Sequence, residues 1–172
     1  MNRILVLLAV AWAGLPAGAQ KVHVDFDHAC NFSSYQTYRW APSSPGQEMN
    51  QLMQERVTGF IEEALAARRL KRVEKAGDLL ISYKTSTEEL PQYTTFSDGT
   101  GPGWGWGWGS SVSVTTVQPI LLGTIVVDIT DARQKRLVFQ GVATTTVSAK
   151  PQHNTKKLAS AVRKIFEKYP PR

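Results

Sequence analysis

Short segments in which apolar and polar residues alternate are the feature that most constrains the fold of this chain. Residues 21–28 (KVHVDFDH) alternate strictly, with Val22, Val24 and Phe26 on one side, which is typical of a half-buried strand. Alternation and flanking turn residues predict further strands at residues 37–40, 79–87, 111–117, 123–130 and 136–147. After Glu88 the sequence is interrupted by Pro and Gly, so we expect irregular backbone up to residue 111.

Two segments carry the three- and four-residue apolar spacing of a helix. The first covers residues 48–69 and is expected to bury Phe60; the second covers residues 155–168, follows the capping sequence His153-Asn154-Thr155 and is expected to bury Ile165. Because helices do not alternate with every strand, the order predicts an α+β domain. We expect an antiparallel β-sheet with two helices packed on one face, and a long Gly/Trp-rich hairpin or loop.

The N-terminal residues predict export. Arg3 precedes an apolar run at residues 4–15, and Ala17-Gly18-Ala19 is typical of a cleavage site, so residues 1–19 are interpreted as a signal peptide. The single domain then covers residues 20–172. An uncleaved membrane anchor is the alternative, and the small residues at 17–19 argue against it. No Cys lies near the predicted cut, so a lipid anchor is not expected there.

The net charge and the cysteine content limit the classes of binding partner and the disulfides that we expect. Removal of the signal peptide leaves 19 basic and 14 acidic residues, a net charge of +5, which is either an ordinary solubility charge or suited to an anionic envelope surface. Export makes nucleic acid an unsuitable partner. Cys30 is the one cysteine, so we expect no internal disulfide; it is either buried or pairs between chains.

No sequence motif predicts catalysis or a cofactor. The chain has no G-x-S-x-G elbow, no cysteine signature and no phosphate-binding glycine loop, so no catalytic residue is proposed from the sequence. His23, Asp25 and Asp27 share one face of the first strand and are weak metal candidates. Because alternate side chains on a strand lie about 7 Å apart, we interpret them as a solvent-facing row and predict no metal site.

The run GWGWGWG at residues 103–109 is the most unusual stretch. If it is extended, Trp104, Trp106 and Trp108 project from one face, and we expect them to be partly exposed on a loop or hairpin tip. Three uses remain open: structural cover for the sheet, stacking on a sugar or another ligand, and anchoring at a membrane surface. These three residues are the candidate binding site.

Five stretches together resemble a family of exported bacterial proteins called domain of unknown function 4136. They are VDFDHACNFSSYQTYRWAP, AGDLLISY, the aromatic-glycine run, GTIVVDITDARQKRLVFQGVA and the closing AVRKIFEKYPPR. The resemblance implies a protein of the periplasm or cell envelope of a Gram-negative-type bacterium, and implies no reaction. The sequence thus predicts a non-catalytic envelope protein that binds a partner protein, a glycan or a membrane surface. The alternative is a hydrolase-like enzyme, which would need titratable side chains that converge in a cleft.

Overall fold

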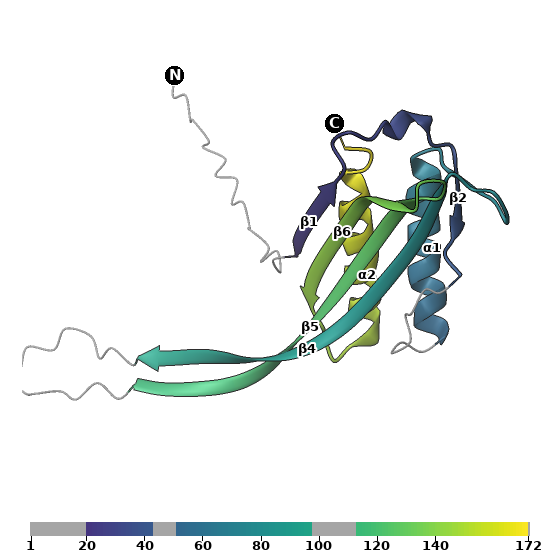
Figure 1. Ribbon diagram of the computed structural model, residues 1–172. Coiled ribbons are helices and arrows are strands. Elements are labelled where there is room, and N and C mark those ends of the chain that lie inside the picture. Colours follow the sequence, from purple (N-terminus) through teal and green to yellow (C-terminus); the bar gives the residue numbers. More distant parts are fainter. Residues whose placement is uncertain (1–19, 43–50, 98–112, 172) are drawn as a thin grey trace, which may run out of the picture.

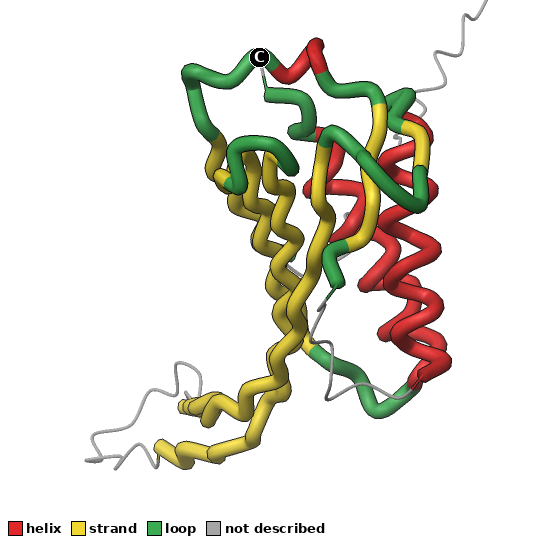
Figure 2. The backbone as a smooth tube through the Cα atoms, turned by 45° about the vertical axis from the view of Figure 1, so that its right-hand side comes forward, coloured by secondary structure: helices red, strands yellow, loops and turns green. Residues whose placement is uncertain are grey.

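The computed structural model describes residues 20–42, 51–97 and 113–171. In chain order their elements are β1 (Lys21–Phe26), the short 3-10 helix η1 (Phe32–Ser34), β2 (Thr37–Trp40), α1 (Gln51–Ala67), β3 (Lys71–Arg72), β4 (Leu79–Ser97), β5 (Ser113–Asp131), β6 (Arg136–Thr146) and α2 (Pro151–Glu167). These residues form one six-stranded sheet, with α1 and α2 side by side on one face (Figure 1; Figure 2). The predicted α+β class is confirmed.

The sheet is mixed, so the prediction of an antiparallel sheet was wrong in part. Its strand order is β1-β6-β5-β4-β2-β3, and β2 runs parallel to both β3 and β4, whereas the other neighbours are antiparallel. The reason is connectivity. β2 is followed by α1 instead of a tight turn, and the helix carries the chain back so that β3 and β4 start at the same end as β2.

The core lies between the sheet and the two helices. α1 buries Val57, Ile61 and Leu65, and α2 buries Ala161, Val162, Ile165 and Phe166. Ile165 is buried as expected, but Phe60 is only partly buried, so that prediction was wrong. Phe60 is adjacent to Ile61 and therefore lies about 100° round the helix, where it lines the groove between α1 and α2.

The start of α2 also differs from the expected one. The helix begins at Pro151, earlier than the predicted cap at residues 153–155, because proline suits the first helical position. Asn154 acts from within the first turn: its Oδ1 accepts from Ser148 N at 2.7 Å and its Nδ2 donates to Ser148 O at 2.7 Å. The predicted capping residue therefore fastens the loop between β6 and α2. No helix among the described residues is both long and apolar enough to cross a membrane.

β4 and β5 form a ribbon that extends past the rest of the sheet (Figure 1; Figure 2). β2 pairs with β4 only as far as Ile81, and β6 pairs with β5 only from Leu122 onward. Residues 89–97 and 113–121, called the arm here, therefore pair with each other and with no other described strand. The expectation of irregular backbone after Glu88 was wrong for residues 89–97, because regular pairing continues to Ser97 opposite Ser113. The rest of that expectation, at residues 98–110, lies outside the described residues.

Two prolines sit within the arm without breaking the ladder. Pro91 lies directly opposite Pro119. Ile81 and Leu121 direct their carbonyls to the outer edges of the ribbon, where they accept from Ala41 N and Val147 N. In a strand, the backbone nitrogen and carbonyl of one residue point to the same side, and this side alternates from one residue to the next. Pro91 lies an even number of residues from Ile81, and Pro119 lies an even number from Leu121. The nitrogens of both prolines therefore also face outward. Because proline has no N–H, these two residues remove donors from the free edges of the ribbon and leave the hydrogen bonds between β4 and β5 complete.

Candidate functional site

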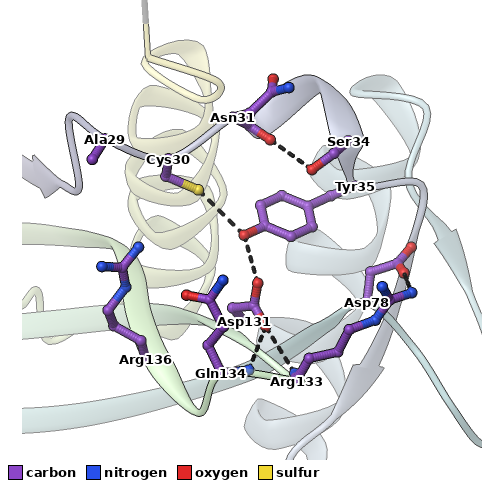
Figure 3. A pocket seen from close by; sticks show the side chains of 10 residues that line it. All are labelled: Ala29, Cys30, Asn31, Ser34, Tyr35, Asp78, Asp131, Arg133, Gln134 and Arg136. Carbon is purple, nitrogen blue, oxygen red and sulfur yellow. Dashed lines mark hydrogen bonds and ion pairs between the residues drawn. The ribbon is translucent and has the colours of Figure 1, made fainter.

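A polar cavity of about 310 Å³ lies at the end of the sheet remote from the arm. Its walls come from the segment after β1, from the start of β4 and from the β5–β6 turn (Figure 3). The lining residues are Ala29, Cys30, Asn31, Ser34, Tyr35, Asp78, Asp131, Arg133, Gln134 and Arg136. Titratable side chains from distant parts of the sequence therefore meet in one cavity, which the sequence did not reveal.

Asp131 is the centre of this cavity and is 6% exposed. Its Oδ1 accepts from the backbone N–H groups of Arg133 and Gln134, each at 2.8 Å, and its Oδ2 accepts from the Tyr35 hydroxyl at 2.8 Å. The Tyr35 oxygen also lies 3.2 Å from Cys30 Sγ (Figure 3). Because the single hydroxyl proton of Tyr35 is directed to Asp131, the thiol of Cys30 is the donor to the phenolic oxygen.

The surroundings of Tyr35 and Asp131 shift their pKa values in opposite directions. Burial, followed by the hydrogen bonds to Cys30 and Asp131, raises the pKa of Tyr35 far above its usual value. The backbone N–H of Gln134 is the largest cause that lowers the pKa of Asp131, although burial opposes it. At neutral pH Tyr35 thus keeps its proton and Asp131 is ionised. Cys30 Sγ is hydrogen-bonded to the protonated Tyr35 hydroxyl, which is not a general base, so this contact is not the nucleophile–base pair of covalent catalysis.

Asp78 makes a second saturated network beside the first. Its Oδ2 accepts from Gln36 N at 3.2 Å, Thr37 N at 3.0 Å and Thr37 Oγ1 at 2.7 Å. The Thr37 hydroxyl is the leading cause of the lowered pKa of Asp78, and the Arg133 guanidinium lies 3.6 Å from its Oδ1. These contacts tie the starts of β2 and β4 to the β5–β6 turn. The polar cavity thus organises one end of the fold.

The structure does not bring the weak metal candidates together. Asp25 Oδ1 accepts from Phe26 N at 2.9 Å, and His23 is exposed on β1. Asp27 Oδ1 accepts from Ala29 N at 2.9 Å, while its Oδ2 is paired with the Arg136 guanidinium. Within the described ranges, no three His, Cys, Asp or Glu side chains are grouped so that they could hold a metal ion.

The arm is the second candidate site. Trp104, Trp106 and Trp108 belong to residues 98–112, which lie outside the described residues. On the strands that lead into and out of this segment, Tyr93 lies opposite Val117, and their exposed fractions are 68% and 53%. Val117 ends the predicted strand at residues 111–117, but neither residue was predicted as a binding candidate. For Tyr93, the strand-forming run YTTF at residues 93–96 was the signal that could have shown it, and Pro91 obscured it.

The whole-chain comparison supports the resemblance seen in the sequence. A family model described as a domain of unknown function, DUF4136, matches residues 22–171. The chain belongs to the DUF4136 family. None of the curated proteins compared with this DUF4136 chain matches it.

Solved structures share the fold of the DUF4136 chain at low sequence identity. A PDZ domain protein from Parabacteroides distasonis has a TM-score of 0.58 and 13% identity; the match covers 89% of this chain but 36% of that one. This chain thus spans about a third of that protein. The PelC dodecamer from Paraburkholderia phytofirmans has a TM-score of 0.51 and 12% identity, over 86% of this chain and 95% of that one. These likenesses show a shared fold alone.

Proposed function

We propose that this DUF4136 chain is a non-catalytic exported protein of the cell envelope that makes contact with a partner protein, glycan or membrane surface through the arm and the Trp-rich segment that joins its strands. The observation that carries the proposal is the arm itself, which extends beyond the layers of the body (Figure 1). An isolated two-stranded hairpin is marginally stable in water. A chain that maintains one far from its core is therefore expected to use it for contact.

The exposed side chains of the arm favour a binding role for it. Tyr93 and Val117 form an exposed cross-strand pair, and Leu121, at the arm's base, is 43% exposed. Exposed apolar groups clustered on a narrow support mark a contact surface more often than isolated ones do. In the sequence, residues 98–112 then add Trp104, Trp106 and Trp108 between the two strand ends.

The prolines indicate how the contact is made. Because Pro91 and Pro119 remove donors from both free edges, the arm is poorly suited to recruit another strand through its backbone. Binding through side chains is the remaining mode. The PelC protein named above forms a dodecamer. The proposed partner protein therefore includes a second copy of this chain.

The test compares two arm variants with a matched control. One variant changes Trp104, Trp106 and Trp108 to Ser, the second changes Tyr93 and Val117 to Ser, and the control is Leu137→Ser, which removes an apolar group that is 46% exposed on the body. Binding is measured by co-sedimentation with envelope vesicles, by co-sedimentation with cell-wall glycan, and by cross-linking in envelope extracts. Whichever assay shows binding of the unaltered protein identifies the class of partner.

We expect both arm variants to bind at least about tenfold more weakly, which corresponds to about 1.4 kcal/mol, with the control unchanged. Thermal unfolding checks that the body is intact. Undiminished binding by both arm variants would overturn the proposal. Loss of the fold in the Trp variant would instead show that the three indoles are structural cover, and the Tyr93 and Val117 variant would then decide whether the arm binds.

A further inference from the structure

An apolar pocket of about 240 Å³ opens between the sheet and the N-terminal halves of both helices, at the base of the arm. Most of its surface is apolar, and its wall combines Gly123, Ile125, Ala143, Leu158 and Ala161 with five threonines. Its volume is below the roughly 300 Å³ at which typical small-molecule pockets begin. Its size and lining therefore suit one narrow aliphatic chain better than a ring system.

A cationic groove of about 340 Å³ adjoins this pocket. It is lined by Gln20, Thr145, Thr146, Lys156, Lys157, Ser160 and Lys164, none of which is acidic. Thr145, Thr146 and Lys157 line both spaces, so the apolar pocket and the groove lie next to each other and share this part of their walls. A ligand that occupies both must therefore carry an aliphatic chain at one end and a negative charge at the other.

Lys157 stands at the junction of the two spaces. Its Nζ donates to Thr146 O at 2.8 Å and to Thr146 Oγ1 at 2.9 Å, which fixes the ammonium over the end of β6. An ammonium has three donors, so one is left for a ligand. Gln20, whose side chain bonds to Lys157 O at 2.8 Å and to Ser160 Oγ at 3.1 Å, closes the other side of the groove.

We propose that the pocket and groove bind an anionic phospholipid, with part of an acyl chain in the apolar pocket and the phosphate against Lys156, Lys157 and Lys164. Three ammonium groups match a phosphate, which presents several oxygens, better than the single carboxylate of a fatty acid. A zwitterionic headgroup is disfavoured because the lysines repel its quaternary ammonium. This site is separate from the contact surface of the arm and does not depend on it.

The experiment titrates the purified protein with 1-palmitoyl lysophosphatidylglycerol, below the concentration at which it forms micelles. Calorimetry gives the affinity and native mass spectrometry gives the stoichiometry; lysophosphatidylcholine and palmitate are the comparison ligands. Thr85→Phe, which changes a half-buried residue of the pocket wall, tests the acyl chain. The double variant Lys157→Gln and Lys164→Gln tests the phosphate. Lys75→Gln, in the loop before β4, is the control for loss of one lysine.

We expect one lysophosphatidylglycerol per chain, bound at least about tenfold more tightly than lysophosphatidylcholine. The double lysine variant should lose this preference, Thr85→Phe should weaken both lipids, and Lys75→Gln should change neither. Tighter binding of palmitate than of lysophosphatidylglycerol would overturn the phosphate assignment. Absence of binding, or equal binding by the unaltered protein, the pocket variant and the lysine variant, would overturn the site. None of these results depends on whether the arm variants bind envelope material.

Discussion

At the scale of single residues, Gly141 is where the sheet and α2 come closest. A Cβ added there would overlap Ile165 Cγ2 and lie 3.2 Å from Ile165 Cβ, and Ile165 is fully buried. Because the neighbour is a core side chain, Gly141→Ala is expected to lower the free energy of unfolding by about 1–3 kcal/mol in urea denaturation. Gly59 is the matched control, since an added Cβ meets nothing within 4 Å. Gly59→Ala should stabilise α1 by up to about 1 kcal/mol, and equal losses at both positions would contradict this account.

Asp131 provides a second prediction at this scale, one that depends on pH. Asp131→Asn places an amide where a carboxylate accepts three hydrogen bonds, so we expect a loss of about 1–3 kcal/mol at pH 7. The pKa of Asp131 is lowered in the folded protein, so its contribution is present above the unfolded pKa, about 3.9, and is lost as pH falls through the folded pKa. The deficit of the variant should therefore shrink as the pH is lowered from 7 to about 2.5. Urea denaturation across this range is the measurement, and a deficit that stays constant would show that the charge of Asp131 does not contribute.

At the scale of elements, α1 shows what apolar spacing can and cannot predict. The spacing identified the helix, but Phe60, Ile61, Ala64 and Leu65 form one broad apolar surface in the sequence. Ile61 and Leu65 on this surface are buried in the core, whereas Phe60 lines the groove beside α2. Which of these residues is buried therefore depends on the position of α2. Periodicity along one helix carries no information on the position of another.

This division of the α1 surface gives a direct comparison of two substitutions. Ile61 is fully buried, so Ile61→Ala is expected to lower the free energy of unfolding by about 2–5 kcal/mol. Phe60→Ala should cost less, because the ring is only partly buried and the helix groove beside it is open to water. Chemical denaturation of both variants is the measurement. A larger loss for Phe60→Ala would show that the groove is closed in solution.

The arm shows the opposite limit, where strong local signals were misleading. Pro91 and Pro119 suggest irregular backbone when each is taken alone, but opposite each other they leave the β4–β5 ladder intact. Likewise, alternation in residues 37–40 predicted a strand correctly but not its parallel pairing with β4, because both orientations have the same two-residue period. Pairing partners, unlike strand propensity, are set by residues distant in the sequence.

If Pro91 and Pro119 protect the free edges of the arm, replacing them should expose those edges. We expect Pro91→Thr combined with Pro119→Thr to restore two outward N–H donors and to promote self-association through strand pairing. Analytical ultracentrifugation over a range of protein concentrations is the measurement. The control changes the neighbouring cross-strand pair Gln92 and Gln118 to Thr, which raises strand propensity without adding outward donors. Self-association of both variants, or of neither, would contradict the prediction that the prolines protect the free edges.

At the scale of the whole molecule, the two ends of the body differ in what the sequence could reveal about them. The Tyr35–Asp131 contact joins residues 96 positions apart, so no local pattern could predict the polar cavity. The Trp-rich run, by contrast, was singled out from its composition alone, and the strands that flank it proved to be the arm. The pocket and groove at the base of the arm combine β4, β5, β6 and both helices, and therefore appear only in the assembled fold.

Export of the whole chain gives the last prediction, because it fixes where the mature protein should begin. Gln20 follows Ala17-Gly18-Ala19 directly, and its side chain already bonds to α2 through Lys157 O and Ser160 Oγ. A signal peptidase needs small residues just before the cut, so cleavage after Ala19 would remove the apolar run and leave the docked Gln20 as the first residue. N-terminal sequencing of the protein recovered from the envelope fraction of its host should therefore begin at Gln20, with Ala19→Tyr shifting or blocking the cut. Recovery of the protein in the cytosol with Met1 intact would remove the envelope from the proposed function, while leaving the lipid-binding experiment on the purified protein unaffected.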